Sequence, residues 1–290
     1  MLNIEGLTEK EFLEKYDPSQ FEHPSYTVDD LLFAIEEKQS NDVRKLNRKK
    51  LQVLLLKRTN HPYINTWCLP GVFIKMDESL EEASLRALKE KTDFKNIYLE
   101  QLYTYGEVNR DKRTRVITTT YLGLIDKNQS QIKETFVNEE TKWFDFKINT
   151  ISMKKEKIDN GVKQILEYKI ILSNEEIILD NIIQVIINTV NKITTKEVKI
   201  VKNDNIGFDH LKIIYCGIER IRNKIEYSDI AFSLLPDKFT IAELQQVYEL
   251  ILNKKFTKAN FQRKIGNRIK PIDEYRLGGF RPAKLYIYQK

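Results

Sequence analysis

The sequence predicts an α/β (α+β) fold with a mixed sheet, followed by a small helical module that ends in a β-hairpin. Three observations predict it: short apolar runs bounded by polar residues, amphipathic helices that begin with capping boxes, and an excess of lysine and arginine confined to the last fifth of the chain. With 290 residues the chain exceeds the usual domain of roughly 100 to 200 residues, so we expect two domains or one with a large insertion.

The composition is typical of a soluble globular protein. Hydrophobic residues make up 41% and charged residues 31%, with 10 glycines and 7 prolines, which excludes collagen-like, low-complexity and wholly disordered chains. The most apolar run, 177–190, is broken by polar residues, and no signal peptide is recognisable, so we expect no membrane contact. Cys68 and Cys216 lie far apart in a large chain, which favours the reducing cytoplasm.

The first part of the chain is expected to contain an extension and the first strands. Positions 1–24 are typical of a helix and a loop, and a strand is predicted at 26–35. After a polar loop at 36–50, the apolar run 51–56 predicts the next strand. Proline, asparagine and tryptophan at 58–70 indicate irregular chain.

A helix is predicted after this irregular segment. Ser79 and Glu82 form a capping box, and apolar residues follow at helical spacing until Asp93, just past the expected end. Together with the strands, this helix indicates a mixed-sheet domain at 25–146. Further strands are expected at 99–105, at 114–125 and from 141 to 146.

The segment 147–207 is harder to assign. Alternation at 163–172 favours strands, whereas 177–193 has helical periodicity. We therefore expect an insertion or subdomain here, and then a linker helix at 208–225 with one apolar stripe. The linker helix and the C-terminal module form the last expected domain, 208–290.

The C-terminal module predicts a winged helix-turn-helix. Thr240 and Glu243 form a second capping box ahead of an amphipathic helix at 241–252. After a tight connection, Thr257 is a good N-cap for a second, basic helix. A Leu-Gly-Gly turn and an alternating strand at 284–288 then indicate a β-hairpin wing.

Positive charge is concentrated in this module. Positions 236–290 contain 12 Lys and Arg against 5 Asp and Glu, a net +7, so the other residues sum to −1 of the total +6. A basic helix-turn-helix is expected to bind double-stranded DNA, since phosphate contacts release counterions. A solvated basic surface and a protein–protein module are the alternatives. The expected DNA contacts are Lys258, Asn260, Gln262, Arg263, Lys264, Arg268, Arg276 and Arg281.

The segment 69–94, LPGVFIKMDESLEEASLRALKEKTDF, resembles the Nudix box, G-x5-E-x7-R-E-U-x-E-E-x-G-U, where U is apolar. Glu78, Arg86 and Glu90 match the pattern. Ala87 and Lys91 stand where the family has two of its three metal-binding glutamates. The remaining matches are Leu88 and Phe94, and the remaining departures are Val72 and Asp93, which replace glycines.

These departures predict that metal-dependent hydrolysis is lost or very weak. Ala87, Glu90 and Lys91 sum to zero charge where the family has −3, and magnesium requires carboxylate oxygens. We therefore expect no catalytic residues, no metal and no cofactor. The alternative for the segment is an ordinary amphipathic helix without any ligand site.

The resemblance to the Nudix fold extends beyond the helix, to Trp67 and Pro70 before the box and to QLYTYGEVNRDKRTRVITTTYLGLI at 101–125. It implies a Nudix-like mixed-sheet sandwich whose cleft binds a ligand without cutting it. A phosphorylated or nucleotide-linked sugar would be bound by cationic side chains and by a stacking aromatic ring. The residues expected to bind this effector are Arg58, Arg86 and Lys91, with Trp67 or Tyr105 as the stacking ring.

The chain as a whole resembles the Nudix-related transcriptional regulators. The segments that carry this resemblance are FDH at 208–210, RIRNKIEYS at 220–228, the long match at 234–265 and FRPAKLY at 280–286. It implies a cytoplasmic homodimer that binds a palindromic operator and senses ADP-ribose or a sugar. The compact family members lack a segment like 147–207.

Two other functions remain open from the sequence. A Nudix hydrolase of ADP-ribose or a related diphosphate would need Mg²⁺, with Glu78, Glu90 and carboxylates outside the box. A protein-interaction adaptor would use neither the cleft nor the basic helix.

Overall fold

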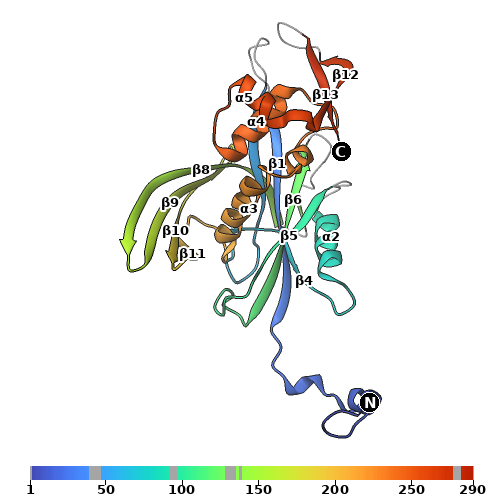
Figure 1. Cartoon of the computed structure of the whole chain (residues 1–290). Helices are drawn as coiled ribbons and strands as arrows, with labels where there is room; N and C mark the ends of the chain where they lie inside the picture. The colour runs from blue at the N-terminus through green and yellow to red at the C-terminus, as the bar shows by residue number, and fades with distance from the viewer. Residues whose placement is uncertain are drawn as a thin grey trace.

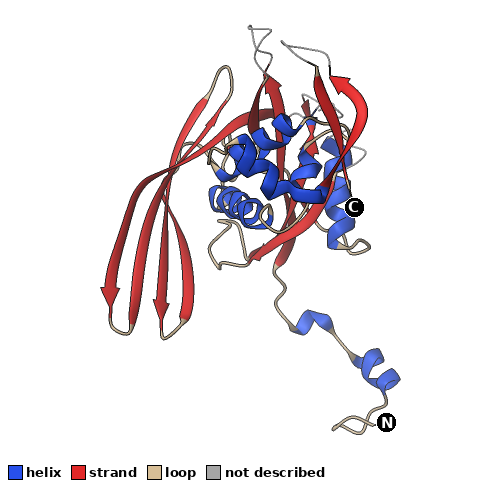
Figure 2. Cartoon of the chain, turned by 45° about the horizontal axis from the view of Figure 1, so that its top comes forward, coloured by secondary structure: helices blue, strands red, loops and turns tan. Residues whose placement is uncertain are grey.

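The computed structural model of the protein describes residues 2–38, 47–91, 97–127, 135–136, 139–276 and 282–289. Its largest feature is an 11-stranded sheet that runs through the molecule in Figures 1 and 2. The long strands are β1 (Ser25–Lys38), β2 (Arg48–Lys57), β5 (Tyr98–Tyr105), β6 (Val116–Asp126), β8 (Glu139–Ile158), β9 (Gly161–Ser173), β10 (Ile178–Val190) and β11 (Ile193–Lys202). The short strands are β3 (Trp67–Cys68), β4 (Gly71–Phe73) and β7 (Thr135–Phe136).

The order of the sheet is β11-β10-β9-β8-β2-β1-β6-β5, with β3, β4 and β7 paired to β2, β1 and β8. The sheet is mixed because β1 runs parallel to β6 but antiparallel to β2. This confirms the predicted fold class, and all strands predicted before residue 147 are present.

The central strand β1 is buried on both faces because a helix covers each of them. Leu31 and Phe33 point toward α3 (His210–Lys224), whereas Leu32, one position along, packs on the side of α2 (Leu80–Lys91). Figure 1 shows the two helices on opposite sides of the sheet. The capping box that starts α2 is formed as predicted, with Ser79 and Glu82 bonded to each other's backbone N–H.

Helix α3 lies unusually close to the sheet. A Cβ atom added to Gly217 would stand 2.1 Å from Leu31 Cδ2 and 3.4 Å from Phe33 Cε2. Only glycine allows this approach without a shift of the Leu31 side chain. The backbone of α3 therefore packs directly on the buried side chains of β1.

The segment 147–207 is not a separate subdomain, which corrects the boundary expected from the sequence. Strand β8 is 20 residues long and crosses that boundary, and β9 to β11 continue the same sheet. The predicted helical character of 177–193 is also wrong. In β10 the buried positions Leu179, Asn181, Ile183 and Val185 alternate with half-buried ones, because one face packs toward α3.

The C-terminal module has the predicted order of a winged helix-turn-helix. It contains η3 (Ile230–Leu234), α4 (Ile241–Leu252), α5 (Lys258–Ile265), η4 (Gly266–Arg268) and the hairpin β12 (Ile269–Arg276) and β13 (Ala283–Tyr288). The capping box at Thr240 and the N-cap at Thr257 are both formed. One hydrophobic cluster joins α3, α4 and α5 to the sheet, so the module shares the main core.

Residues 2–24 form an arm that projects from the body in Figure 1. It contains α1 (Glu9–Lys15) and η1 (Pro18–Gln20), and neither has a buried residue. Several large apolar side chains of the arm are exposed: Leu2, Ile4, Phe12, Leu13, Tyr16 and Phe21. Within the described residues, no helix is long and apolar enough to span a membrane.

Candidate functional site

A cleft of about 120 Å³ lies where the sheet meets the start of α3. Strands β1 and β4 form one wall, and the 106–115 connection between β5 and β6 forms another. Phe208 and His210 complete it from the beginning of α3. The cleft therefore joins the Nudix-like part of the chain directly to the helix that leads to the winged helix.

A buried ion pair fastens the 106–115 connection to α3. Arg110 Nη2 lies 2.8 Å from Asp209 Oδ1, and Nε lies 3.1 Å from Oδ2, so the guanidinium binds the carboxylate through two parallel bonds. The side chains are only 3% and 9% exposed. Arg110 Nη2 also lies 3.6 Å from Asp29 Oδ2, which adds a second acid to the same cation.

The imidazole of His210 forms part of the cleft wall beside this pair. Its Nδ1 accepts a hydrogen bond from the Leu69 N–H at 2.8 Å, which places the proton of the neutral ring on Nε2. Burial lowers the pKa of His210, although Asp29 and Asp209 oppose the shift. His210 is therefore neutral at pH 7 and links α3 to the chain just before β4.

Phe208 turns its ring toward the cationic side of the cleft. Its backbone is left-handed (φ 54°), and its ring centroid lies 5.1 Å from the Arg58 guanidinium carbon. Arg58 is held in place because its Nε donates to the Pro62 carbonyl at 2.8 Å. Elsewhere in the lining, Arg113 pairs with Asp111 at 2.8 Å, and its guanidinium carbon lies 5.5 Å from the centroid of the Phe73 ring.

The residues of the degenerate box do not form a metal site. Arg86 binds Glu78 (Nε to Oε2, 2.8 Å) and the Phe73 carbonyl (3.0 Å), and this hydrogen bond lowers the pKa of Glu78 to about 2. Ala87 is buried in the core and has no oxygen ligand to offer. Glu90 lies 3.6 Å from Arg86 Nη1 on the exposed side. No group of three or more His, Cys, Asp or Glu among the described residues could hold a metal ion, so this donor set does not fit Mg²⁺.

The second helix of the helix-turn-helix presents a polar, basic outer face. Lys258, Asn260, Gln262 and Arg263 are exposed, while Phe261 is buried against α4. The helix contains three cations and no acid. Arg263 donates to Asn260, so these two side chains lie together on the surface.

Three other cations of the module are engaged within the chain. Lys264 pairs with Glu226, and Arg276 pairs with Glu243 and donates to the Lys238 carbonyl at 3.1 Å. Arg268 Nη1 donates to the Ser228 carbonyl at 3.4 Å. These contacts brace α5 and the wing against the rest of the module. Arg281 lies outside the described residues.

Two models of known protein domains match the chain. The NUDIX domain model matches residues 39–167, and the model of the NrtR DNA-binding winged helix domain matches residues 231–288. The "ADPR responsive transcriptional repressor NtrR" of Acinetobacter baylyi is 27% identical over 293 residues, covering 99% of this chain and 91% of the relative. The chain therefore contains a NUDIX domain followed by a DNA-binding winged helix domain of the NrtR type.

Two solved structures resemble this chain over most of its length. Shewanella oneidensis NrtR complexed with a 27mer DNA is 28% identical with a TM-score of 0.60, covering 91% of this chain and 93% of its own. A MutT/nudix family protein from Enterococcus faecalis is 25% identical with a TM-score of 0.65, covering 98% and 94%. Because these matches span nearly the full chain, they include most of the 147–207 segment.

Of the predicted effector residues, only Arg58 lines the cleft. Trp67 is 1% exposed and packs edge-on against Phe144, so it offers no stacking face. Tyr105 is only 9% exposed, and burial beside Cys216 raises the pKa of its hydroxyl, so its ring is not open to a ligand. Arg86 is occupied by Glu78, as described above. The side chain of Lys91 lies outside the described part of the chain.

Five of the cleft residues that sequence reasoning missed come from two segments. The sequence GEVNRDKRTR at 106–115 supplies Arg110, Asp111 and Arg113, and FDH at 208–210 supplies Phe208 and His210. The cluster of arginines in the first segment, between two predicted strands, could have indicated an anion-binding wall. The second segment could not be placed, because it lies about a hundred residues away along the chain.

Proposed function

We propose that the chain is a cytoplasmic transcriptional regulator, a homodimer that binds operator DNA through α5 and the wing and takes ADP-ribose in the cleft as its effector. The Acinetobacter relative is named for its response to ADP-ribose, and the Shewanella relative was crystallised with DNA. The observation that carries the proposal is the construction of the cleft from the sheet and from the first residues of α3.

In this proposal the diphosphate occupies the cleft itself. A volume of about 120 Å³ is well below the roughly 300 to 1,000 Å³ of a complete ligand pocket, so the rest of the effector must extend along the surface. Arg58, just after β2, and Arg113, in the 106–115 connection, are the lining cations available to the diphosphate besides Arg110. The Phe73 ring, 49% exposed, supplies an aromatic face next to Arg113.

The Arg110–Asp209 pair is the proposed coupling point. A diphosphate beside Arg110 competes with Asp209 for the same guanidinium, and any change in that pair acts on the first turn of α3. At its other end α3 contacts the winged helix, where Arg222 Nε donates to the Ile251 carbonyl at 2.8 Å. A helix of 15 residues spans about 22 Å, which is the distance the signal travels.

The DNA-binding half of the proposal relies on the exposed face of α5. In a helix-turn-helix the second helix enters the major groove, where amide and guanidinium groups read base edges. Asn260, Gln262 and Arg263 are placed for that role, and Lys258 is placed for a phosphate. In a homodimer two such helices need a fixed spacing, so an effector that shifts α3 changes operator affinity.

The test is gel retardation of the DNA upstream of the chain's own gene, with and without ADP-ribose. We expect retardation by the wild type and a change of affinity on adding ADP-ribose. Arg58→Ala should still bind DNA but respond only to higher ADP-ribose concentrations, since it removes a cleft cation far from α5. Equal ADP-ribose responses in wild type and Arg58→Ala would contradict the cleft assignment.

A further inference from the structure

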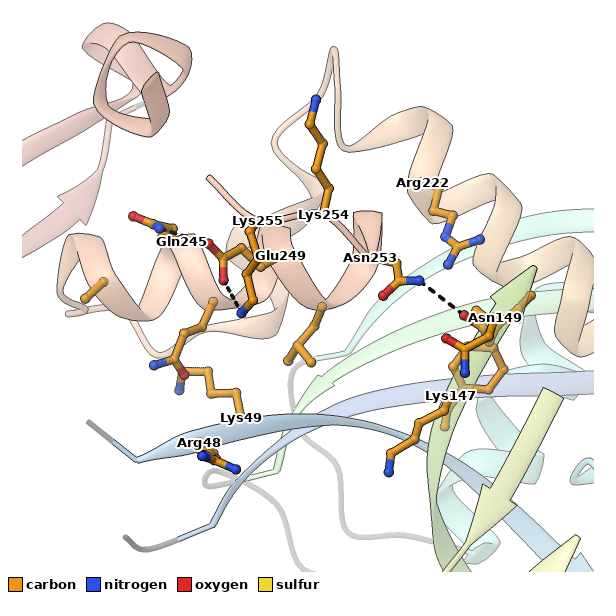
Figure 3. A pocket seen from close by; sticks show the side chains of 15 residues that line it. Arg48, Lys49, Lys147, Asn149, Arg222, Gln245, Glu249, Asn253, Lys254 and Lys255 are labelled. Atoms are coloured by element: carbon orange, nitrogen blue, oxygen red, sulfur yellow. Dashed lines mark hydrogen bonds and ion pairs between the residues drawn. The ribbon is translucent and has the colours of Figure 1, made fainter. Parts of the chain in front are cut away.

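A second cavity, separate from the cleft, lies between the winged helix and the sheet. Its volume is about 780 Å³, within the range of pockets that enclose a complete small ligand. Figure 3 shows it between α4 on one side and β2 and β8 on the other. It shares no lining residue with the effector cleft.

The helical wall of this cavity is the polar face of α4. Ala242, Gln245, Gln246, Glu249 and Asn253 recur at i, i+3, i+4, i+7 and i+11, on the side opposite the buried stripe of the helix. The core of the winged helix does not use this face. It instead faces the sheet across an open space of ligand size.

The charge of the cavity is strongly positive. Six of its lining residues are Lys or Arg, and one is an acid, Glu249. Lys49 and Lys255 are neutralised by Glu37 and Glu249, and Lys254 points away from the space in Figure 3.

Three cations remain to face a ligand, and they come from three elements. Among the described residues, Arg48 on β2 and Lys147 on β8 have no acidic partner within ion-pair distance. Arg222 on α3 points toward Asn149 in Figure 3; its Nε donates to the Ile251 carbonyl and its Nη1 lies 3.4 Å from Glu219, which leaves Nη2 to face a ligand. Uncompensated cations at a concave site favour a phosphate-bearing ligand.

The remaining lining groups fit the organic part of such a ligand. The amides of Asn149 and Asn253 provide donors and acceptors, whereas Gln245 provides its oxygen, since its Nε2 donates to Glu249 and to the Phe256 carbonyl. Leu250 adds apolar surface. The Gln246 side-chain oxygen is buried without a hydrogen-bond partner among the described residues. A buried acceptor left unpaired is costly, so a donor from a ligand would stabilise it.

We propose that this cavity binds a phosphorylated small molecule of nucleotide size, with its phosphates between Arg48, Lys147 and Arg222. A ligand held by α4 on one side and by the sheet on the other fixes the winged helix relative to the effector-binding part. The regulatory consequence rests on the proposed function above. Ligand binding does not depend on it.

The experiment is calorimetric titration of the full-length protein with ATP, AMP and inorganic pyrophosphate. The test variant is Arg48→Glu/Lys147→Glu, and the matched control is Lys155→Glu/Lys157→Glu, which makes the same charge change at exposed positions of β8 outside the cavity. We expect saturable ATP binding to wild type and control, and at least roughly 30-fold weaker binding to the test variant. Arg58→Ala, in the other cleft, should bind ATP as the wild type does.

Three results would overturn the proposal. They are equal ATP affinity in the test variant and wild type, no saturable binding of any probe up to about 1 mM, and loss of ATP binding in Arg58→Ala, which would place the nucleotide in the effector cleft. If the double charge reversal fails to fold, Arg48→Gln/Lys147→Gln serves instead, with the same expectation in direction.

Fluorescence anisotropy with labelled operator DNA distinguishes the two possible sources of phosphate. If the cavity binds a small molecule, the test variant retains DNA binding without ATP. If Arg48 and Lys147 instead contact the DNA backbone, the variant loses DNA and ATP competes with the duplex, which refutes the proposal. A protein that binds ATP here but no DNA at all would contradict only the proposed function.

Discussion

Replacing Asp209 by alanine should destabilise the protein more than most single substitutions. The change leaves Arg110 charged, with a side chain only 3% exposed, and removes two hydrogen bonds of 2.8 and 3.1 Å. Breaking one partner of a buried ion pair costs about 3 to 5 kcal/mol, because the other charge stays buried. Asp29, 3.6 Å from Arg110, compensates in part, so we expect the lower end, about 3 kcal/mol.

In a chain of 290 residues this loss corresponds to a fall in Tm of about 5 °C if unfolding is cooperative. The assay is thermal unfolding followed by circular dichroism, together with urea unfolding to obtain the free energy directly. Glu107→Ala is the matched control. It removes a 3.2 Å pair with Lys212 that joins the same connection to the same helix, but Glu107 is 66% exposed, so the cost should stay below about 1 kcal/mol.

The refuting result is a small difference between these two variants. If Asp209→Ala unfolds within about 1 kcal/mol of Glu107→Ala, the buried pair does not fasten α3 to the cleft. In that case the proposed path from the effector to the winged helix would lose its physical basis. Asp209→Asn, which keeps the shape and one acceptor oxygen, should lie between wild type and Asp209→Ala.

Four further predictions follow from the fold and the two sites. Gly217→Ala should lower stability by about 1 to 3 kcal/mol in urea unfolding, because the new methyl group overlaps Leu31 Cδ2; equal stability would mean that α3 can move outward freely. Burial lowers the pKa of His210, so the unfolded chain takes up a proton first as pH falls below about 6.5, and stability is lost in that range. His210→Gln, which cannot titrate, should flatten that part of the stability curve, and an unchanged slope would assign the effect to other groups. Lys258→Ala together with Arg263→Ala should weaken operator binding at least roughly tenfold in anisotropy titrations and reduce its salt dependence, without changing Tm. Finally, purified protein with Mg²⁺ should not hydrolyse ADP-ribose to AMP and ribose 5-phosphate, as followed by chromatographic separation of the products, and brisk turnover would show that other carboxylates replace the lost glutamates.

Local chemistry made the helices of the C-terminal module predictable. Thr240 and Thr257 are strong N-caps, and the helices begin directly after them, because the cap satisfies backbone donors within one turn of chain. Ser79 did the same for α2. In each case the information lies within four residues, so no tertiary contact had to be known.

The strand β10 shows where local information failed. Its run of isoleucines is broken by Asp180, Asn181, Gln184 and Asn188, a spacing that also suits one face of a helix. Pairing with β9 along the whole strand, and with β11 from Ile182 onward, decided the outcome. Isoleucine and valine favour strands, but which neighbours are available is a property of the whole sheet.

The candidate cleft was only partly predictable for a related reason. The box pattern located α2 and showed that its metal ligands are missing, yet the cationic residues that line the cleft lie elsewhere. Trp67 looked like a ligand-stacking ring in the sequence, but Phe144 from a distant strand covers it. Whether an aromatic residue is free to bind depends on such long-range packing.

The single hydrophobic cluster that links the sheet, α3 and the winged helix has a consequence for how the molecule responds to stress. Two modules on a flexible tether would melt separately and could each be produced alone. Here the sheet and the winged helix share one hydrophobic core. Cutting the chain before α4 would therefore expose apolar surfaces of the helices and strands to water, which favours aggregation. Differential scanning calorimetry should accordingly record one unfolding transition. An effector in the cleft can then change the position of the winged helix only by repacking this shared core.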